Sequence, residues 1–222
     1  GRYGDGKGRA AQWLGSPQPR AFTSGVFKFH STPTGSVIRD EDLYRTISRG
    51  VPGTWMPGWE ALLTPAERWA LVRYIKGFSP LSDQGEPAPP VEIPSPPVPS
   101  PEVVREGRFV YAMLQCGKCH GARGRGDGPS AADLKDDWGE RNKPYDLTRG
   151  AYRNGAAPSD LYRTLLTGLR GTPMPALEPA GAAFPGGRDA EVARFKEPLS
   201  PAELRELETY LATHPSAAEL AR

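Results

Sequence analysis

Cysteine and histidine are scarce in this chain: its 222 residues include only two cysteines and three histidines. Two cysteines cannot build a disulfide-rich scaffold, and the five Cys and His side chains suffice for at most one four-ligand zinc site. No run of about 20 apolar residues occurs, so we expect no direct membrane span. The formal net charge is only +2, which argues against a nucleic-acid partner.

Proline and glycine, by contrast, are abundant, with 25 prolines and 26 glycines. Nine of the prolines fall between Ser79 and Pro101. Each proline removes a backbone N–H donor and fixes φ, so this stretch can form neither a helix nor an interior strand. We expect an extended, semi-rigid linker at residues 79–101. A proline-rich docking ligand for another protein is the alternative.

The segments on either side of this linker repeat each other. Five blocks of the first segment recur in the same order in the second. The pairs are Gly1–Leu14 with Gly121–Leu134, Phe22–Gly25 with Leu147–Gly150, Asp42–Gly50 with Asp160–Gly168, Gly53–Pro57 with Gly171–Pro175, and Leu63–Glu67 with Leu199–Glu203. Chance similarity does not preserve such an order, and the long period is typical of tandem domains. We therefore predict two copies of one module, called here the first and the second copy.

Helix signals dominate both copies. Residues 101–114 begin with proline and carry apolar residues at helical spacing, and residues 159–168 predict a helix with a Ser159 cap and a closing glycine. Thr64 and Ser200 each precede Pro-Ala-Glu, which predicts a capping box and a final helix. No convincing alternating strand run is present. We predict an all-α fold whose small core needs a further cross-link or cofactor for stability.

A motif for such a cofactor occurs in the second copy, at Cys116-Gly-Lys-Cys119-His120. Two thiols three residues apart can add to the two vinyl groups of a haem, and the next imidazole can ligate its iron; this is the attachment pattern of c-type haem. A zinc site would need two more ligands, and only His30 and His214 remain, neither at a typical spacing. A thioredoxin-like site would need a βαβ setting, which is absent.

Met174 is the candidate for the second axial ligand of the iron. It follows the attachment motif in Gly171-Thr-Pro-Met-Pro175, a loop that prolines stiffen. A thioether is a soft ligand suited to haem iron, and His/Met ligation raises the reduction potential. Methionine can also simply fill a gap in a core. Two of the three methionines, Met56 and Met174, nevertheless share the Gly-Thr-x-Met-Pro frame, so we predict both as iron ligands.

The order of helix, Cys-x-x-Cys-His, glycine-rich loop, Gly-Thr-x-Met-Pro loop and final helix resembles the class I c-type cytochromes, in tandem as in di-haem cytochromes c. The resemblance covers almost all of the second copy. It implies two tandem all-α cytochrome c domains, at residues 1–78 and 102–222, with Gly107 and Tyr111 packed against Tyr210. It also implies covalent haem c and a periplasmic or other extracytoplasmic location, because such haem is attached outside the cytoplasm.

The first copy departs from this pattern. Gly1 aligns with Gly121, the residue directly after the attachment motif, so the first copy lacks the N-terminal helix and the motif. Because Met56 keeps its proline frame, we expect a second haem near it, attached upstream of Gly1 in a longer native protein. A haem-free first half used for docking is the alternative. The second copy departs from the pattern too. Met174 and Ser200 are 26 positions apart, whereas the equivalent Met56 and Thr64 are 8 positions apart. We predict that the additional residues form a surface loop.

The predicted function is electron transfer, because an iron with both axial positions filled by protein does not readily bind oxygen or peroxide. The chain would be a periplasmic carrier or a cytochrome subunit of a respiratory or dehydrogenase complex, and not an enzyme. Redox proteins or a membrane-associated respiratory complex would be its partners, with any anchor upstream of Gly1 or in a partner. A di-haem enzyme such as a cytochrome c peroxidase, or a docking subunit with a haem-free first half, are the alternatives.

Overall fold

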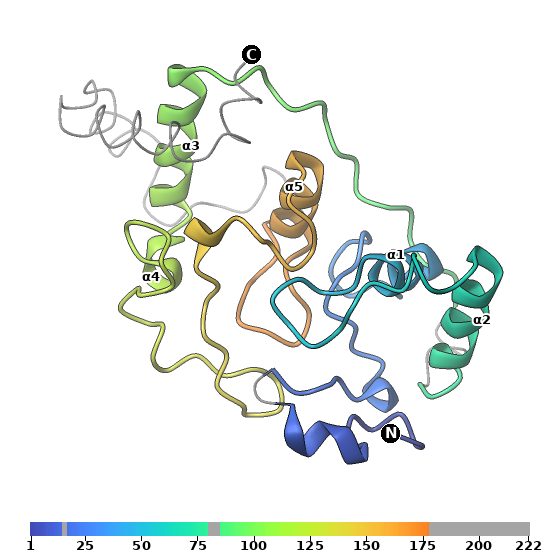
Figure 1. Ribbon diagram of the computed structural model, residues 1–222. Helices are drawn as coiled ribbons and strands as arrows, with labels where there is room; N and C mark the ends of the chain where they lie inside the picture. The colour runs from blue at the N-terminus through green and yellow to red at the C-terminus, as the bar shows by residue number, and fades with distance from the viewer. Residues whose placement is uncertain (15–16, 80–84, 178–222) are drawn as a thin grey trace. The chain divides into compact units, whose positions relative to one another are not determined.

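The computed structural model describes residues 1–14, 17–79 and 85–177 (Figure 1). Over these residues the chain forms helices and loops, with no strand and one isolated bridge between Lys135 and Arg141. The all-α prediction is confirmed for this part of the chain.

Several sequence predictions concern residues outside the described ranges. The predicted final helix after Ser200 lies outside these ranges, and so does Tyr210, the predicted partner of Tyr111. The extra residues between Met174 and Ser200 lie outside as well, apart from the first few.

The described residues divide into two compact units. The first unit holds residues 1–94, 133–143 and 149–177; the second holds residues 95–132 and 144–148. The units therefore do not coincide with the two sequence copies, because two segments of the second copy belong to the first unit. The division into consecutive domains at 1–78 and 102–222 stays a prediction.

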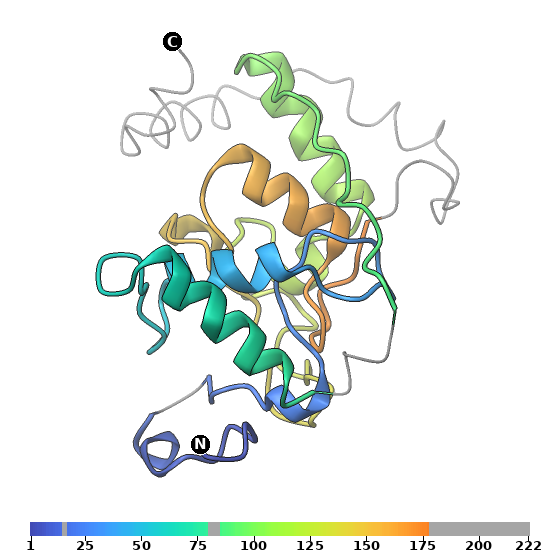
Figure 2. The same cartoon turned by 90° about the vertical axis from the view of Figure 1, so that its right-hand side faces the viewer.

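The first unit contains helices α1 (Asp40–Arg49), α2 (Pro65–Lys76) and α5 (Pro158–Thr167), with short 3-10 turns at Arg9–Trp13 and Phe22–Ser24. Helices α1 and α2 lie side by side, as Figure 2 shows. Leu43 and Ile47 of α1 and Val72 of α2 form the core of this unit together with Phe27 and Ile38, which precede α1.

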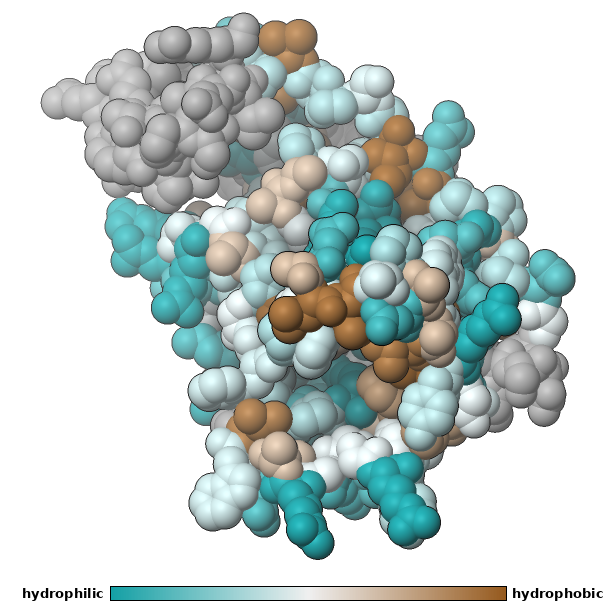
Figure 3. Space-filling view, turned by 45° about the vertical axis from the view of Figure 1, so that its right-hand side comes forward, coloured by the Kyte–Doolittle hydropathy of each residue, from teal (hydrophilic) through white to brown (hydrophobic). Residues whose placement is uncertain are grey.

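This core is small, and many apolar side chains stay at the surface. Trp13, Trp55 and Leu62 are each more than two thirds exposed. In Figure 3 hydrophobic residues (brown) form separate patches among hydrophilic ones on the face shown. The described part of the chain thus encloses little apolar area, and such a small core gains little from the hydrophobic effect alone.

Local sequence signals explain where the helices begin and end. Helix α2 has the predicted capping box: the Thr64 hydroxyl accepts a hydrogen bond from the Glu67 N–H, and the Glu67 carboxylate accepts one from the Thr64 N–H. The predicted Ser159 cap of α5 is wrong. Proline at position 158 already has a helical φ and starts the helix, so Ser159 lies inside the first turn. Gly168, with φ of 68°, ends α5 as predicted.

The second unit contains α3 (Pro101–Met113) and the short α4 (Gly117–His120). The Ser100 hydroxyl caps α3 by accepting from the Val103 N–H. Residues 85–100 before it carry no helix or strand, as the proline content predicts. The start of this stretch is nevertheless attached to the first unit, because the Val91 N–H donates to the Ser31 carbonyl over 2.7 Å.

Candidate haem site

The motif residues lie at the short helix α4. Cys119 and His120 belong to the helix, and Cys116 directly precedes it. Cys116 is the N-cap of α4, and its carbonyl accepts from the N–H groups of Cys119 and His120 at 3.2 and 2.9 Å. A positive φ of 56° at Gln115 makes the sharp turn from α3 into α4. One turn of backbone thus presents two free, partly exposed thiols and one imidazole.

The His120 ring is fixed by a backbone carbonyl. Its Nδ1 lies 3.1 Å from the carbonyl oxygen of Tyr145. A carbonyl oxygen can only accept a hydrogen bond, so Nδ1 carries the proton and Nε2 keeps its lone pair. This tautomer is the one that binds a metal through Nε2, and the carbonyl partner fixes the orientation of the ring.

The glycine-rich loop after the motif wraps closely around α4. The Gly126 N–H donates to the His120 carbonyl at 2.8 Å, and the Gly128 N–H donates to the Cys119 carbonyl at 3.2 Å. A Cβ on Gly128 would overlap the Lys118 carbonyl. Tyr111 of α3 donates its hydroxyl proton to the Gly121 carbonyl at 2.7 Å. The loop therefore needs glycine for close approach, which explains the glycine repeat of the sequence.

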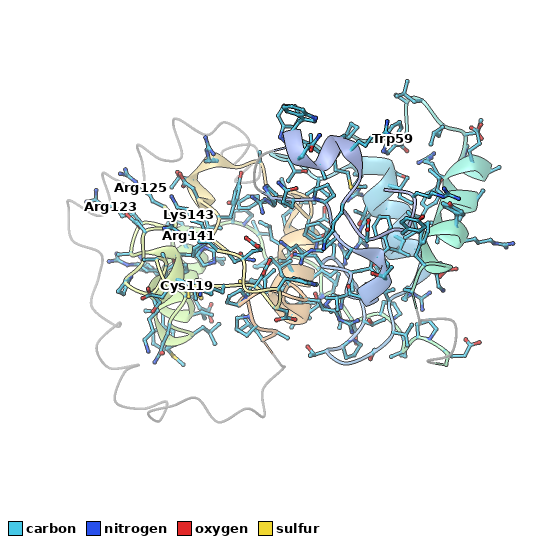
Figure 4. All side chains as sticks on the ribbon, turned by 90° about the horizontal axis from the view of Figure 1, so that it is seen from below. Trp59, Cys119, Arg123, Arg125, Arg141 and Lys143 are labelled. Carbon is cyan, nitrogen blue, oxygen red and sulfur yellow. The ribbon has the colours of Figure 1, made fainter. Side chains whose placement is uncertain are left out.

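Charged groups of this loop point outward. Arg123 and Arg125 are exposed and alternate with the buried Gly124 and Gly126, and Figure 4 shows both arginines on the same stretch of chain.

The Cys116 thiol is partly buried. Burial raises its pKa, and the nearby Cys119 adds to the effect. The neutral thiol is therefore favoured at neutral pH before any covalent attachment.

Met174 lies in a tight loop of the first unit that the backbone closes on itself. The Leu169 N–H donates to the Met174 carbonyl at 3.1 Å. The Thr172 hydroxyl donates to the Leu169 carbonyl at 2.7 Å and accepts from the Met174 N–H at 3.3 Å. One threonine side chain thus sets the position of the methionine backbone.

The Met56 loop has the same hydrogen bonds. The Val51 N–H donates to the Met56 carbonyl at 3.0 Å, and the Thr54 hydroxyl donates to the Val51 carbonyl at 2.7 Å and accepts from the Met56 N–H at 3.2 Å. Each loop follows a glycine of nearly equal backbone angles, Gly50 with φ 69° and ψ −163°, and Gly168 with φ 68° and ψ −165°. The sequence repeat is therefore also a repeat of structure.

The structure brings together three of the five predicted site residues, Cys116, Cys119 and His120, in the second unit. Met56 and Met174 lie in the first unit. The pairing of His120 with Met174 at one iron stays a prediction.

Sequence reasoning did not find every group that positions these residues. The Tyr145 carbonyl has no sequence signature, since every residue carries a carbonyl. The hydroxyls of Thr54 and Thr172 could have been found, because threonine recurs in both copies of the Gly-Thr-x-Met-Pro frame.

A family model described as "Cytochrome c" matches residues 104–215, which include the whole attachment motif. The chain belongs to the cytochrome c family. Members of this family carry covalently bound haem c and transfer electrons through it, and they are typically extracytoplasmic. The residues of this cytochrome c fit the group, since two free thiols and an available imidazole Nε2 lie on one turn.

Among solved structures, this cytochrome c is similar to a chain of the reducing HAO-like protein complex of Kuenenia stuttgartiensis. The two are 44% identical, with a TM-score of 0.75, over 79% of this chain and 80% of that chain. The search of curated proteins found no match. Within the described ranges, every helix is too short or too polar to cross a membrane.

Proposed function

We propose that this cytochrome c is an electron-transfer subunit of an extracytoplasmic redox complex. Cys116 and Cys119 would hold the haem, and His120 and Met174 would ligate its iron. When bound, haem c supplies an iron that alternates between the ferrous and ferric states. The single observation that carries the proposal is the His120 ring, whose Nδ1 proton is held by a carbonyl so that Nε2 is free to bind a metal.

The residues around these ligands hold them in place and do not provide groups for substrate chemistry. The Tyr145 carbonyl orients the imidazole. Thr172 fixes the backbone of Met174. If His120 and Met174 both ligate the iron, these protein side chains would occupy the positions that a substrate needs, which favours electron transfer over an enzymatic role.

A second haem near Met56 is the finer part of the proposal. The Met56 loop repeats the hydrogen bonds of the Met174 loop within 0.1 Å, from Val51 and Thr54 in place of Leu169 and Thr172. A loop built to present a thioether is thus kept in the first copy.

The similar chain from Kuenenia stuttgartiensis belongs to a protein complex, and this supports a subunit over a free carrier. The residues between the predicted domains at 1–78 and 102–222 would hold the two haem sites close to each other. Purification of the native protein tests this point. A partner recovered at a fixed ratio supports the subunit, whereas a monomeric cytochrome contradicts it.

The axial ligands are tested by Met174→Ala and Met56→Ala in the native holoprotein, with Met113→Ala of α3 as the control. Each of the first two variants should remove the methionine–iron charge-transfer band of one haem and lower its reduction potential on the order of 0.1 V or more. The control should change neither. Unaltered spectra in Met174→Ala would overturn His/Met ligation and favour an exchangeable site, as in a peroxidase.

The haem count is tested separately, by a pyridine haemochrome assay combined with intact mass. Two haems per native polypeptide are expected. One haem would contradict the second site near Met56 and favour a haem-free first half that serves in docking, while the function of the second copy would stand.

A further inference from the structure

The Met174 loop is packed against side chains from other parts of the first unit. At Gly171, three residues before the methionine, an added Cβ would come within 2.6 Å of the Trp138 ring and 3.2 Å of the Val26 side chain. The Asp137 N–H donates to the Gly171 carbonyl at 3.3 Å. Val26 belongs to the first copy, so the loop of one copy rests partly on the other.

The Trp138 ring is itself held by the first copy. The Arg20 guanidinium stacks over the ring, 4.1 Å from its centroid, and its Nη1 lies 3.9 Å from Oδ2 of Asp136. Oδ1 of Asp136 accepts from the N–H groups of Trp138 at 3.1 Å and Glu140 at 3.0 Å, which fixes the turn that carries the ring. Arg20 therefore contacts both the ring and the carboxylate that fixes its turn.

The surroundings of Arg20 strengthen this stack. Burial lowers the pKa of Arg20, against the attraction of Asp136 and Asp137. A cation that has lost part of its hydration interacts more strongly with an aromatic face. Arg2 stacks on Tyr3 in the same way, but at 5.7 Å and with both side chains exposed. We therefore expect the Arg20–Trp138 stack to be the stronger of the two.

Arg170, the residue before Gly171, makes a further contact with the first copy. Its guanidinium donates a hydrogen bond to the Ser36 carbonyl. Hydrogen bonds from a charged donor are stronger than neutral ones. Two consecutive residues of the Met174 loop are thus held from the first copy.

The equivalent positions of the Met56 loop differ at both places. Pro52 replaces Arg170 and has no side-chain donor. An added Cβ at Gly53, the equivalent of Gly171, would meet no atom within 4 Å. The contacts at Gly171 and Arg170 are therefore not a property of the repeated loop but belong to the second copy.

We propose that Arg20 and Trp138 are positioning residues for Met174, through which the first copy keeps the thioether on the iron of the second. The proposal rests on the proposed ligation by Met174, and it gives the first copy a role that does not depend on a haem near Met56. A thioether is a soft ligand that holds ferric iron weakly. The position of its loop therefore decides how readily another ligand replaces it.

The test titrates imidazole into the native ferric holoprotein. Imidazole must displace Met174, so its apparent affinity rises in proportion to the fraction of molecules with a detached loop. The variants are Trp138→Ala, Arg20→Met and Trp138→Phe, the last of which keeps an aromatic ring under Arg20. Arg2→Met is the matched control, because it removes the same charge and the same kind of stack from the exposed Tyr3.

Trp138→Ala should raise the apparent imidazole affinity about tenfold and Arg20→Met about threefold, while Arg2→Met leaves it unchanged. Trp138→Phe should have a smaller effect than Trp138→Ala. The double variant of Arg20→Met and Trp138→Ala should match Trp138→Ala alone, because Arg20 acts through the ring. Arg20→Met and Trp138→Phe keep the ring site filled, so they decide the question if Trp138→Ala does not fold.

Equal imidazole affinities in the wild type, Arg20→Met and Trp138→Phe would overturn the proposal, and so would an equal rise in Arg2→Met. Additive effects in the double variant would show that Arg20 does not act through Trp138. Failure of Met174 ligation has a different signature, since the wild type would then bind imidazole as tightly as Met174→Ala does. That result would overturn both proposals, whereas equal affinities beside an intact methionine–iron band would overturn only this one.

Discussion

The two methionine loops share a backbone but not surroundings. Both are closed by the same threonine hydroxyl and begin at glycines of equal angles. At Gly171, however, a Cβ would come within 2.6 Å of the Trp138 ring, whereas at the equivalent Gly53 it would meet open space. The repeat thus specifies how a thioether is presented, while the side chains packed beside the loop differ between the copies.

The strongest test of this comparison replaces the glycine that begins each loop. Both Gly50→Ala and Gly168→Ala put a Cβ on a residue with φ near 70° and bring it close to the backbone of the methionine loop. Each should lower the free energy of unfolding by about 3 kcal/mol, from backbone strain and overlap together. Denaturant unfolding measures this, and a large loss in only one copy would break the equivalence of the loops.

The glycines inside the loops provide the matched control. Gly53→Ala should cost only about 1 kcal/mol, since its positive φ is strained but no atom lies within 4 Å of the added Cβ. Gly171→Ala should cost more, because Trp138 must move. Equal costs at the two positions would show that Trp138 does not pack there.

A second test compares Lys28 with Arg153, which occupy equivalent positions in the two copies. The pKa of Lys28 is lowered to about 8, so below pH 8 the lysine is charged in both states and its burial destabilises the fold. Lys28→Met should therefore stabilise the protein by about 2 kcal/mol at pH 7.

This gain has a defined pH window. Between pH 8 and the ordinary lysine value of 10.5, the unfolded chain binds the proton that the folded chain has released, so wild-type stability rises with pH. The advantage of Lys28→Met should disappear above that window. Arg153→Met should show no such dependence over the same range, because a guanidinium stays charged. Unfolding curves at several pH values decide the matter, and a pH-independent gain at Lys28 would contradict the lowered pKa.

The smallest expected effect concerns the final helix of each copy. Thr64→Ala removes the capping box of α2 and should cost about 1 kcal/mol. Ser200→Ala should cost a similar amount if the second copy has the helix that its sequence predicts. Thermal unfolding measures both, and no change at Ser200 would show that prediction to be wrong.

Local sequence patterns predicted much of this molecule. The Pro-Ala-Glu signal at Thr64, the proline that starts α3 and the glycine that ends α5 each depend on neighbouring residues alone, and each was found. The cap at Ser159 was predicted wrongly because Pro158 competes for the same helix start.

What the sequence could not predict depends on contacts between distant residues. Arg20 stacks on the Trp138 ring at 4.1 Å, and Arg49 pairs with Asp160 from the other copy. Neither pair has a fixed spacing or a motif. The candidate site also combines local and distant residues. The attachment residues are close together in the chain and could be predicted, whereas the Tyr145 carbonyl that orients His120 is 25 positions away and could not.

The hydrogen bond from Val91 to Ser31 has a practical consequence for how this chain can be cut. Ser31 is buried, and its N–H and hydroxyl both donate to the Asp42 carboxylate, so the acceptor of the Val91 N–H belongs to the folded interior. A protease should therefore cleave more readily after residue 94 than at residue 91. A cut after Pro94 keeps this hydrogen bond, whereas a cut where the proline-rich composition begins removes it.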